Sequence, residues 1–185
     1  VDAAVLETSR GGVLREGLAF DRCDVAVVTN VGSGDHPGLN YINTVQDLAV
    51  LKRVIVQNVA ATGVAVLNAT DPTVSAMAGK CRGSVTFFAV DKFHPVMATH
   101  RAQGQAVVYV ENGQLVASKG EFQQTIALAS IPITMGGMIP FQVENVMASV
   151  AAAWALGLDW DTIRNGLSSF SNDTHNAQGR FNFFK

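Results

Sequence analysis

Short β-branched apolar runs alternate with helix-type patterns through the first 90 residues, and this alternation restricts the fold more than any other feature of the sequence. The apolar runs, which we expect to be strands, cover residues 1–7, 24–30, 63–68 and 84–90. The helical patterns between them cover residues 13–20, 44–62 and 72–78. Strands that alternate with helices are typical of βαβ units. The sequence therefore predicts an α/β fold with a mostly parallel sheet flanked by helices.

The helix expected from residue 44 has a clear start signal. Thr44 is a good N-cap residue, and Asp47 follows it three residues later, as in a capping box. Apolar residues then recur at helical spacing, at Leu48, Leu51, Ile55 and Val59. We expect Gly63 to end this helix.

The second half of the chain has a different pattern. The dipeptide Asn112-Gly113 joins two apolar runs, which is a strong signal for a two-residue β-hairpin. Further strand is expected over residues 121–134. A helix is expected over residues 141–156, with an apolar stripe formed by Val143, Val146, Met147, Val150 and Trp154. Gly157 is expected to terminate it, and Asp159 to cap a last helix. The sheet should therefore include an additional antiparallel hairpin region.

Charge and hydropathy exclude several classes of protein. The 185 residues are 48% hydrophobic and 15% charged, with a formal net charge of −2, which does not suit a disordered chain or a nucleic-acid-binding surface. The longest apolar stretch, residues 146–158, contains Ser149 and is shorter than the roughly 18 residues of a membrane span. Cys23 and Cys81 lie far apart and suit a reducing compartment. We expect no nucleic-acid partner and no membrane.

Polar residues stand where the expected strands end. These ends carry Glu7, then Thr29 and Asn30, then Asn68 with Asp71. In open α/β sheets, ligands bind at the carboxyl ends of the strands. These side chains are therefore candidates for one ligand site. The alternative is that they only cap helices or shape turns, and Asp71 before Pro72 is suited to a helix cap.

Glu7 and His36 are the candidate metal ligands. A carboxylate at a strand end can hold Mg²⁺ through one oxygen while water molecules fill the other positions. His36 lies in a loop with several glycines, and Asp35 beside it can orient the ring or share a cation. The alternatives are a solvated loop acid and a structural histidine.

Lys52 and Asn145 complete the candidate set. Lys52 lies among apolar neighbours on the helix after that loop, although it also fits a solvated lysine. Asn145 lies near the start of the long helix, where its amide can present a donor and an acceptor to the edge of a heterocycle. The chain has no phosphate-binding GxxxxGK[ST] loop and no GxSxG nucleophile motif. The residues alone thus indicate an α/β domain with a metal and anion site.

An ordered set of short motifs carries a resemblance to a known family. In chain order, the motifs are ETSRGGVLR, FDRCDVAVVTNVGSGDH, LNATDP, FFAV, HRAQG, FQVENV, AAAWALG and GRFN. Each is weak alone, but their order and spacing resemble the Mur-ligase-like module of the cyanophycin synthetases. The resemblance covers nearly the whole chain and implies the central, ATP-binding domain of the wider Mur ligase and folylpolyglutamate synthase superfamily.

The resemblance implies a role for each candidate residue. In the family, the strand-end glutamate and the loop histidine bind magnesium, which corresponds to Glu7 and His36. The helix lysine is carbamylated in several members and supports a second magnesium ion, so Lys52 and His36 are the expected catalytic residues. Nucleotide contacts are expected from Asn68, Asp71 and Asn145 near the base and from Arg180 at the phosphates. ATP and Mg²⁺ are the implied cofactors.

The resemblance also implies a reaction and its partners. Mur-type ligases convert a carboxylate to an acyl phosphate with ATP, and an amine then attacks it to give an amide. In this family the module adds arginine to the aspartate side chains of a polyaspartate backbone. The expected partners are arginine, the aspartate polymer, the rest of the same polypeptide and further copies in a homo-oligomer. A cytoplasmic location suits ATP and reduced thiols. The alternatives are another Mur-type ligase and a non-catalytic assembly domain.

Some features depart from the family pattern. Thr70 stands where the family usually has an aspartate, and no proline precedes Gly179-Arg180. We expect residues 1–180 to be a central domain truncated at its N-terminus, and residues 181–185 to begin a linker to a C-terminal domain. The phosphate-binding loop is expected upstream, so we expect the isolated chain to be inactive.

Overall fold

The protein is built on one six-stranded sheet with the strand order β1-β2-β3-β4-β5-β6. The computed structural model describes residues 3–32 and 42–170. The strands are β1 (Cys23–Val28), β2 (Val59–Asn68), β3 (Ser84–Phe88), β4 (Val107–Glu111), β5 (Gln114–Lys119) and β6 (Phe122–Ala127). The pairs from β1 to β4 are parallel, and those from β4 to β6 are antiparallel. The predicted mostly parallel α/β sheet with an antiparallel hairpin region is confirmed.

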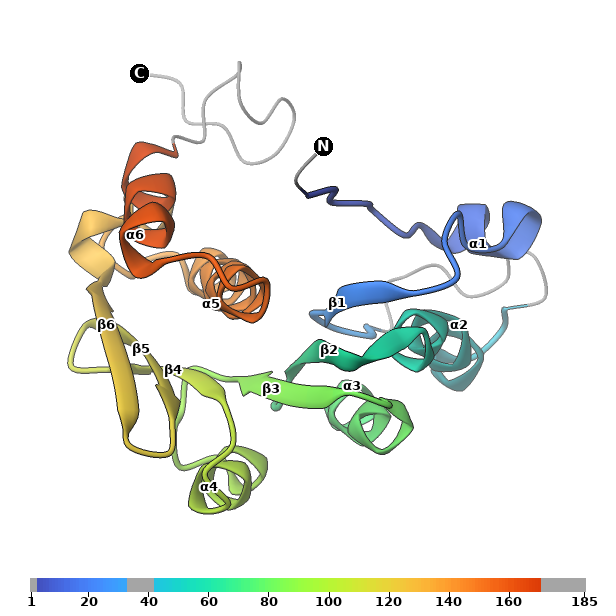
Figure 1. Ribbon diagram of the computed structural model, residues 1–185, viewed down its shortest axis with the longest axis horizontal. Coiled ribbons are helices and arrows are strands. Elements are labelled where there is room, and N and C mark those ends of the chain that lie inside the picture. The colour runs from blue at the N-terminus through green and yellow to red at the C-terminus, as the bar shows by residue number, and fades with distance from the viewer. Residues whose placement is uncertain (1–2, 33–41, 171–185) are drawn as a thin grey trace.

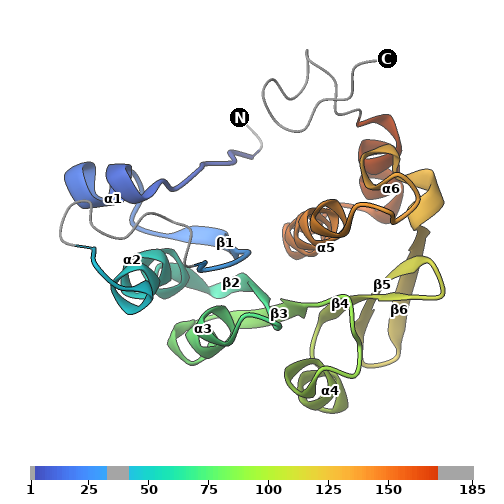
Figure 2. The same cartoon turned by 180° about the vertical axis from the view of Figure 1, so that it is seen from behind.

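Helices cover both faces of the sheet. The helices are α1 (Arg10–Glu16), α2 (Val45–Gln57), α3 (Pro72–Ser75), α4 (Pro95–Ala102), α5 (Pro140–Ala155) and α6 (Trp160–Ser169). The described residues also include short 3₁₀ turns: η1 (Ala76–Lys80) lies between α3 and β3, and η2 (Leu128–Ser130) and η3 (Pro132–Thr134) lie between β6 and α5. Helices α2, α3 and α4 lie on one side of the sheet, and α5 and α6 lie on the other (Figures 1 and 2). The result is a three-layer arrangement.

Each face of the sheet has its own apolar core. Alternate residues of β4 enter different cores, with Val107 facing the α2–α4 side and Val108 the α5–α6 side. This alternation is the two-residue period of a strand that is buried on both faces. Fully buried side chains on the α5–α6 side include Phe88, Leu115 and Met147.

The start of α2 was predicted correctly, but its end was not. Thr44 and Asp47 form a complete capping box, in which the Asp47 backbone N–H donates to Thr44 Oγ1 and the Thr44 backbone N–H donates to Asp47 Oδ2. Hydrogen bonding of the Asp47 carboxylate, first to the Thr44 side chain and then to the backbone N–H groups of Asn43 and Thr44, lowers its pKa. The helix ends at Gln57, and Val59 already belongs to β2. Val59 continues the apolar spacing of the helix although β2 has already begun. Gly63, which was expected to end the helix, therefore lies within β2.

The hairpin from β4 to β5 was predicted correctly. Asn112 and Gly113 both have positive φ, 50° and 72°, which is the backbone that a type I′ turn requires. The strand expected over residues 121–134 is confirmed only as β6. The chain then turns through η2 and η3, where the Thr134 hydroxyl donates to the carbonyl oxygens of Leu128 and Ile131. Hydrogen bonds within these turns therefore satisfy the Leu128 and Ile131 carbonyl oxygens, in place of the hydrogen bonds to a neighbouring strand.

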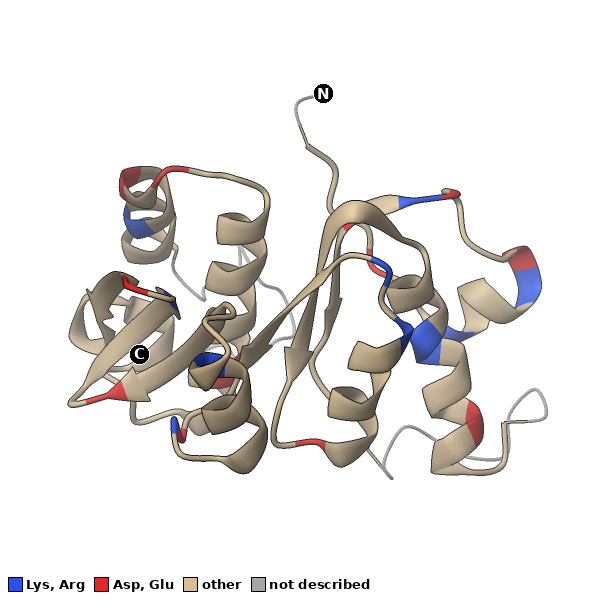
Figure 3. Cartoon of the chain, turned by 60° about the horizontal axis from the view of Figure 1, so that its bottom comes forward, with Lys and Arg blue, Asp and Glu red and all other residues tan. Residues whose placement is uncertain are grey.

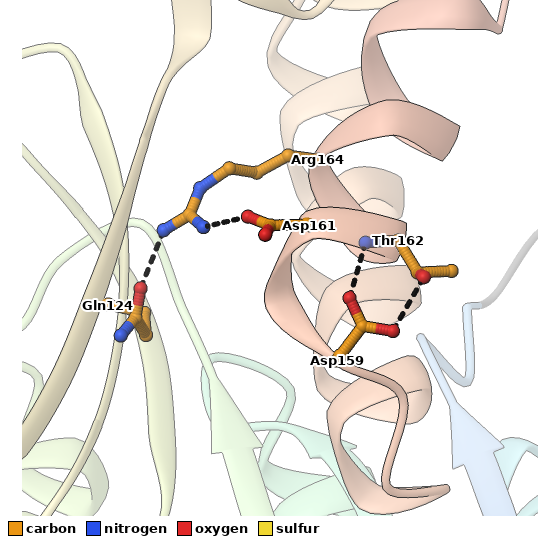
Figure 4. Close-up of polar contacts among 5 residues, drawn as sticks. All are labelled: Gln124, Asp159, Asp161, Thr162 and Arg164. Carbon is orange, nitrogen blue, oxygen red and sulfur yellow. Dashed lines mark hydrogen bonds and ion pairs between the residues drawn. The ribbon is translucent and has the colours of Figure 1, made fainter.

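The two C-terminal helices of the described chain were also predicted correctly. Gly157 follows α5 with a φ of 80°, and the Asp159 carboxylate accepts from the Thr162 backbone N–H and hydroxyl at the start of α6 (Figure 4). Hydrogen bonding to the Thr162 side chain, and then to its backbone, lowers the pKa of Asp159. Arg164 joins α6 to β6 by donating to Gln124 Oε1. Caps and side-chain bonds therefore fix α6 against the sheet.

The expected first strand is wrong. Residues 3–9 form no strand, and the side chains of Val5 and Leu6 are 94% and 59% exposed. An apolar run becomes a strand only when a neighbouring strand takes its backbone hydrogen bonds, and β1 does not pair with this segment. The short helix expected over residues 13–20 begins earlier, as α1, and ends before Gly17.

Charged residues are concentrated away from the sheet. Lys, Arg, Asp and Glu lie mostly on helices and loops, while the strands are nearly free of them (Figure 3). Among the described residues, no helix has the length and apolar character needed to cross a bilayer.

Candidate functional site

A cavity of about 740 Å³ lies along β1, between this strand and the extended N-terminal segment. Its walls come from residues 3–8, the whole of β1, the middle of α2 and the C-terminal half of α5. This volume falls within the range of about 300–1,000 Å³ typical of ligand pockets. The cavity therefore has the size of a site for a small molecule.

Glu7 lines this cavity from the N-terminal segment. It does not end a strand as predicted, because residues 3–9 are irregular, and its side chain is exposed. The segment is anchored just beyond it, where Ser9 caps α1 by accepting from the Gly12 backbone N–H at 3.1 Å. The cap fixes the backbone beside Glu7 and leaves its carboxylate at the wall of the cavity.

Lys52 lines the same cavity from α2. It lies in the middle of α2, is half-buried, and its Nζ donates to the backbone oxygen of Asn30 at 3.2 Å. Asn30 and Thr29 follow β1 directly and line the same cavity. Glu7, Lys52 and the residues that follow β1 therefore line one cavity, whereas Asn68 and Asp71 are not among its lining residues.

The turn between β2 and α3 lies beside this site. Asn68 Oδ1 accepts from both the backbone N–H and the hydroxyl of Thr70, at 2.9 and 2.7 Å. Asp71 Oδ1 caps α3 by accepting from two backbone N–H groups. Asp71 Oδ2 accepts from the Val31 backbone N–H at 2.7 Å. Asp71 therefore ties the turn to the segment after β1, and a role at a nucleotide remains a prediction for Asn68 and Asp71.

Asn145 lies on α5, on the other face of the sheet from Lys52. Its side chain is exposed, and its Nδ2 donates to Gln142 Oε1 at 3.2 Å. With about 3.6 residues per turn, Ala152 and Leu156 fall on the same side of α5 as Asn145. Both of these residues line the cavity, so Asn145 lies on the cavity side of the helix.

Sequence reasoning missed Gln142. It is only 6% exposed, within a helix whose other buried residues are apolar. The available signal was its position, three residues before Asn145, because side chains three apart meet on a helix. Its burial is not visible in a sequence pattern.

Two expected site residues, His36 and Arg180, lie outside the described residues. Within residues 3–32 and 42–170, no three His, Cys, Asp or Glu side chains are grouped as a metal site. Any metal site that includes Glu7 therefore depends on ligands other than such a group. The roles of His36 and Arg180 remain predictions.

The cavity wall contains more cations than anions. Arg10, Arg22 and Lys52 face Glu7 and Asp24 around it. Cys23 also lines the cavity, but burial, and then the negative charge of Asp24, raise the pKa of its thiol. A thiol with a raised pKa carries little thiolate near neutral pH and is a poor nucleophile. The wall is suited to binding anions and metal-bound groups rather than to thiol chemistry.

Comparison with known proteins identifies the family. The Mur ligase middle domain matches residues 1–153. The chain belongs to this family of Mur ligase middle domains. This Mur ligase middle domain is 46% identical to a cyanophycin synthetase of Synechocystis sp. and 45% identical to one of Crocosphaera subtropica. Both matches cover 100% of this chain and 21% of the relative.

The Mur ligase middle domain also has a structural counterpart. The crystal structure of MurF from Acinetobacter baumannii matches 88% of this chain and 31% of that chain, with a TM-score of 0.56 and 19% identity. At this identity the likeness concerns the fold alone. The resemblance to cyanophycin synthetases seen in the sequence motifs is thus confirmed, and the chain spans about a fifth of the length of those relatives.

Proposed function

We propose that the chain is the central part of an ATP-dependent ligase that joins arginine to aspartate side chains of a polyaspartate backbone. The observation that carries the proposal is the cavity beside β1, which both Glu7 and Lys52 line. Identity of 45–46% to cyanophycin synthetases over the whole chain supports this substrate class over that of other Mur-type ligases.

Magnesium fits the residues at the cavity. Glu7 offers an exposed carboxylate, and Thr8, Thr29 and Asn30 add oxygen atoms to the lining of the same cavity. Mg²⁺ prefers oxygen ligands and keeps several water molecules, so one protein carboxylate is sufficient to hold it beside phosphate groups. Glu7 would hold this ion, together with His36 from the segment after β1. Bound magnesium would neutralise the charge that develops on the phosphates.

Lys52 would act from α2. Its Nζ lies against the Asn30 carbonyl, so its position at the end of β1 is fixed by the fold. As a cation it attracts phosphate oxygens, and as a carbamate it supplies a further carboxylate-type ligand for a second metal ion. Either form would bring a charge to the groups that take part in phosphoryl transfer.

Asn145 fits the base of a nucleotide. Its amide is exposed on the cavity side of α5 and presents both a donor and an acceptor. Asn68 and Asp71 would contribute from the β2–α3 turn, and Arg180 would reach the phosphates. The cradle for the phosphates themselves is not encoded in this chain, which has no GxxxxGK[ST] loop.

The reaction needs alignment more than covalent chemistry from the protein. An aspartate side-chain oxygen attacks the γ-phosphorus of ATP, and ADP leaves. The α-amine of arginine then attacks the acyl phosphate, which forms the amide and releases phosphate. The cationic wall with Arg10 and Lys52 would hold the anionic groups in register during both steps.

The proposed function also implies the setting. Residues 1–180 would act with further domains of the same polypeptide, with residues 181–185 leading towards the next one. We place the enzyme in the cytoplasm as a homo-oligomer, where ATP, arginine and the aspartate polymer are its partners.

The direct test is product analysis on the full-length protein. With polyaspartate, arginine and Mg-ATP, mass spectrometry should show arginine added to the polymer, with phosphate released in equal amounts. Lys52→Met should abolish most of this activity, whereas Lys80→Met, at an exposed lysine outside the cavity wall, should not. Addition of a different amino acid would indicate another Mur-type ligase. Absence of both ATP turnover and product would indicate a non-catalytic assembly domain.

A further inference from the structure

The strand β6 forms an open edge of the sheet. It is last in the strand order, pairs only with β5 among the described strands, and lies at the end of the sheet away from β1 (Figure 1). Its sequence, FQQTIA, contains no charged residue and no proline. Edge strands in soluble proteins usually carry such residues, because free backbone N–H and C=O groups otherwise pair with another strand. β6 therefore has the properties of a strand that pairs with a further one.

The ladder with β5 decides which backbone groups of β6 point outward. In an antiparallel pair, alternate residues direct both backbone groups to the neighbouring strand, and the residues between them direct theirs away from it. Leu128, directly after β6, donates its backbone N–H to the Gly113 oxygen just before β5. The even-numbered residues of β6 therefore bond to β5, and the odd-numbered residues point their backbone groups outward.

Gln123 and Thr125 are the outward residues that remain available. The outward oxygen of Ala127 already accepts from Ser130 Oγ at 2.7 Å. In the described chain, no turn or loop hydrogen bond involves the backbone of Gln123 or Thr125, and both side chains are exposed. The free part of the edge is therefore short and uncharged.

Two copies of β6 match each other when they run antiparallel about a two-fold axis at Gln124. Gln123 of one copy then lies opposite Thr125 of the other, and the reverse pair forms across the axis. Because both residues point their backbone groups outward, each pair can exchange two hydrogen bonds. Gln124 on the axis faces its own copy, where a charged side chain would repel itself. The neutral strand is therefore complementary to itself in this register.

An apolar contact adds to this match. The ring of Phe122 is 42% exposed, although it stacks on Trp154. About the same axis, Phe122 lies opposite Ile126 of the partner subunit, on the face of the sheet that carries α5 and α6. The pairing would therefore cover apolar surface that a single chain leaves exposed.

The charges beside this axis are balanced. Arg164 of α6 donates to Gln124 Oε1 and pairs with Asp161 at 3.3 Å (Figure 4). The Asp161 side chain is 90% exposed. Two copies therefore bring two charges of each sign towards the axis. A two-fold contact of this kind places the same surface on both sides without an excess of either charge.

We propose that β6 is an interface between two copies of this chain, which pair antiparallel about a two-fold axis at Gln124 and join two six-stranded sheets into one. This assigns a surface to the homo-oligomer of the proposed function, but it does not depend on the ligase reaction. The interface lies at the opposite edge of the sheet from the cavity beside β1. Pairing therefore leaves the candidate site accessible.

The main test changes the charge at the two outward positions of the full-length protein. Gln123→Lys with Thr125→Lys places like charges opposite each other in both pairs, whereas Gln123→Lys with Thr125→Glu places opposite charges there. Both positions are exposed, so both double variants should fold as the wild type does. By light scattering, the first should weaken the association about tenfold or more, so that the assembly separates into halves on dilution. The second should keep the wild-type mass.

Cross-linking tests the register. Gln124→Cys places a thiol on the axis beside its own copy, where mild oxidation should give a disulfide-linked dimer that reduction reverses. Gln123→Cys is the matched control, because it faces Thr125 of the partner subunit, and it should cross-link far less.

A monomeric wild-type protein, or equal masses for the two double variants, overturns the inference. Equal masses are also the result if another domain of the same polypeptide covers this edge. A cross-link in Gln123→Cys without one in Gln124→Cys overturns the proposed axis. Failure of the proposed function would instead appear as loss of arginine addition by the wild-type protein, so the two failures are distinguishable.

Discussion

The two edges of the sheet are held together in different ways. At one edge, β4, β5 and β6 form continuous antiparallel ladders, and α5 and α6 cover one face of them with a closed apolar core. At the other edge, β1 pairs with β2 alone among the described strands, residues 3–9 form no strand, and a cavity of about 740 Å³ follows β1. The candidate site lies at this second, open edge.

This difference separates stability from function. The β4–β6 edge contains the hairpin, the capped α6 and fully buried side chains such as Leu115, so it can act as a rigid support. The β1 edge leaves Glu7 exposed and Lys52 half-buried at a common space. Ligand sites need accessible polar groups on a rigid scaffold, and the two edges supply these requirements separately.

The largest effect should come from truncating the same kind of residue at each edge. Leu115→Ala removes a fully buried side chain of β5 and should lower the free energy of unfolding by about 2–5 kcal/mol. Leu6→Ala, at a position that is 59% exposed, should change it by less than about 0.5 kcal/mol. Urea denaturation of both variants of this chain measures the two values. Equal losses would show that the N-terminal segment is packed rather than open.

A smaller effect is expected at Gly83, where the backbone before β3 packs against β2. A Cβ at Gly83 would lie 2.2 Å from the Gly63 oxygen and 2.7 Å from the Ala60 oxygen, so Gly83→Ala should destabilise the chain by about 1–3 kcal/mol. Gly166→Ala is the matched control, because its Cβ meets nothing within 4 Å inside α6. That change should stabilise the chain by about 0.5–1 kcal/mol. The melting temperature should therefore fall in Gly83→Ala and rise in Gly166→Ala. A shift in the same direction in both variants would contradict the close packing at Gly83.

The smallest effect concerns the border between the two edges, where α4 packs on β3. Burial lowers the pKa of His100, although its hydrogen bond to the Val85 oxygen opposes this. The unfolded chain therefore binds the proton more readily. The stability from this group is present above about pH 6.5, the ordinary pKa of histidine, and is lost as the pH falls through the folded pKa.

Urea unfolding at pH 7.5 and 5.5 checks this expectation. The wild-type chain should lose more stability on acidification than His100→Gln, which cannot titrate. Parallel losses in the two proteins would mean that the His100 ring is more open to solvent than its packing against Phe87 indicates.

The sequence predicted the elements that depend on local signals. The Asn112-Gly113 turn, the Thr44 capping box and the Asp159 cap each need only a few neighbouring residues, and all three are present. The prediction of a strand over residues 1–7 was wrong because strand formation depends on a partner that is distant in the sequence. The predicted end of α2 was wrong because Val59 continues the apolar helical period although it already pairs with Cys23 in the sheet.

The candidate site could be predicted in part. The strand-end rule predicted that the residues after β1 lie at a ligand site, because the topology of a parallel sheet is local to its βαβ units. Lys52 was a candidate from its place on the following helix and from the family resemblance. The burial of Gln142 and its contact with Asn145 could not be predicted, since they depend on which side of α5 faces the sheet. The bond from Val31 to Asp71 joins residues 40 positions apart and has no local signal.

The most direct test of the proposed site is the magnesium response of Glu7→Gln in the full-length enzyme. The substitution keeps the size of the side chain but removes its charge. The magnesium concentration for half-maximal arginine-dependent ATP hydrolysis should rise about tenfold or more. Glu16→Gln, at the exposed end of α1 and outside the cavity wall, should keep the wild-type response. A wild-type magnesium response in Glu7→Gln would contradict the assignment of the cavity beside β1 as the metal and phosphate site.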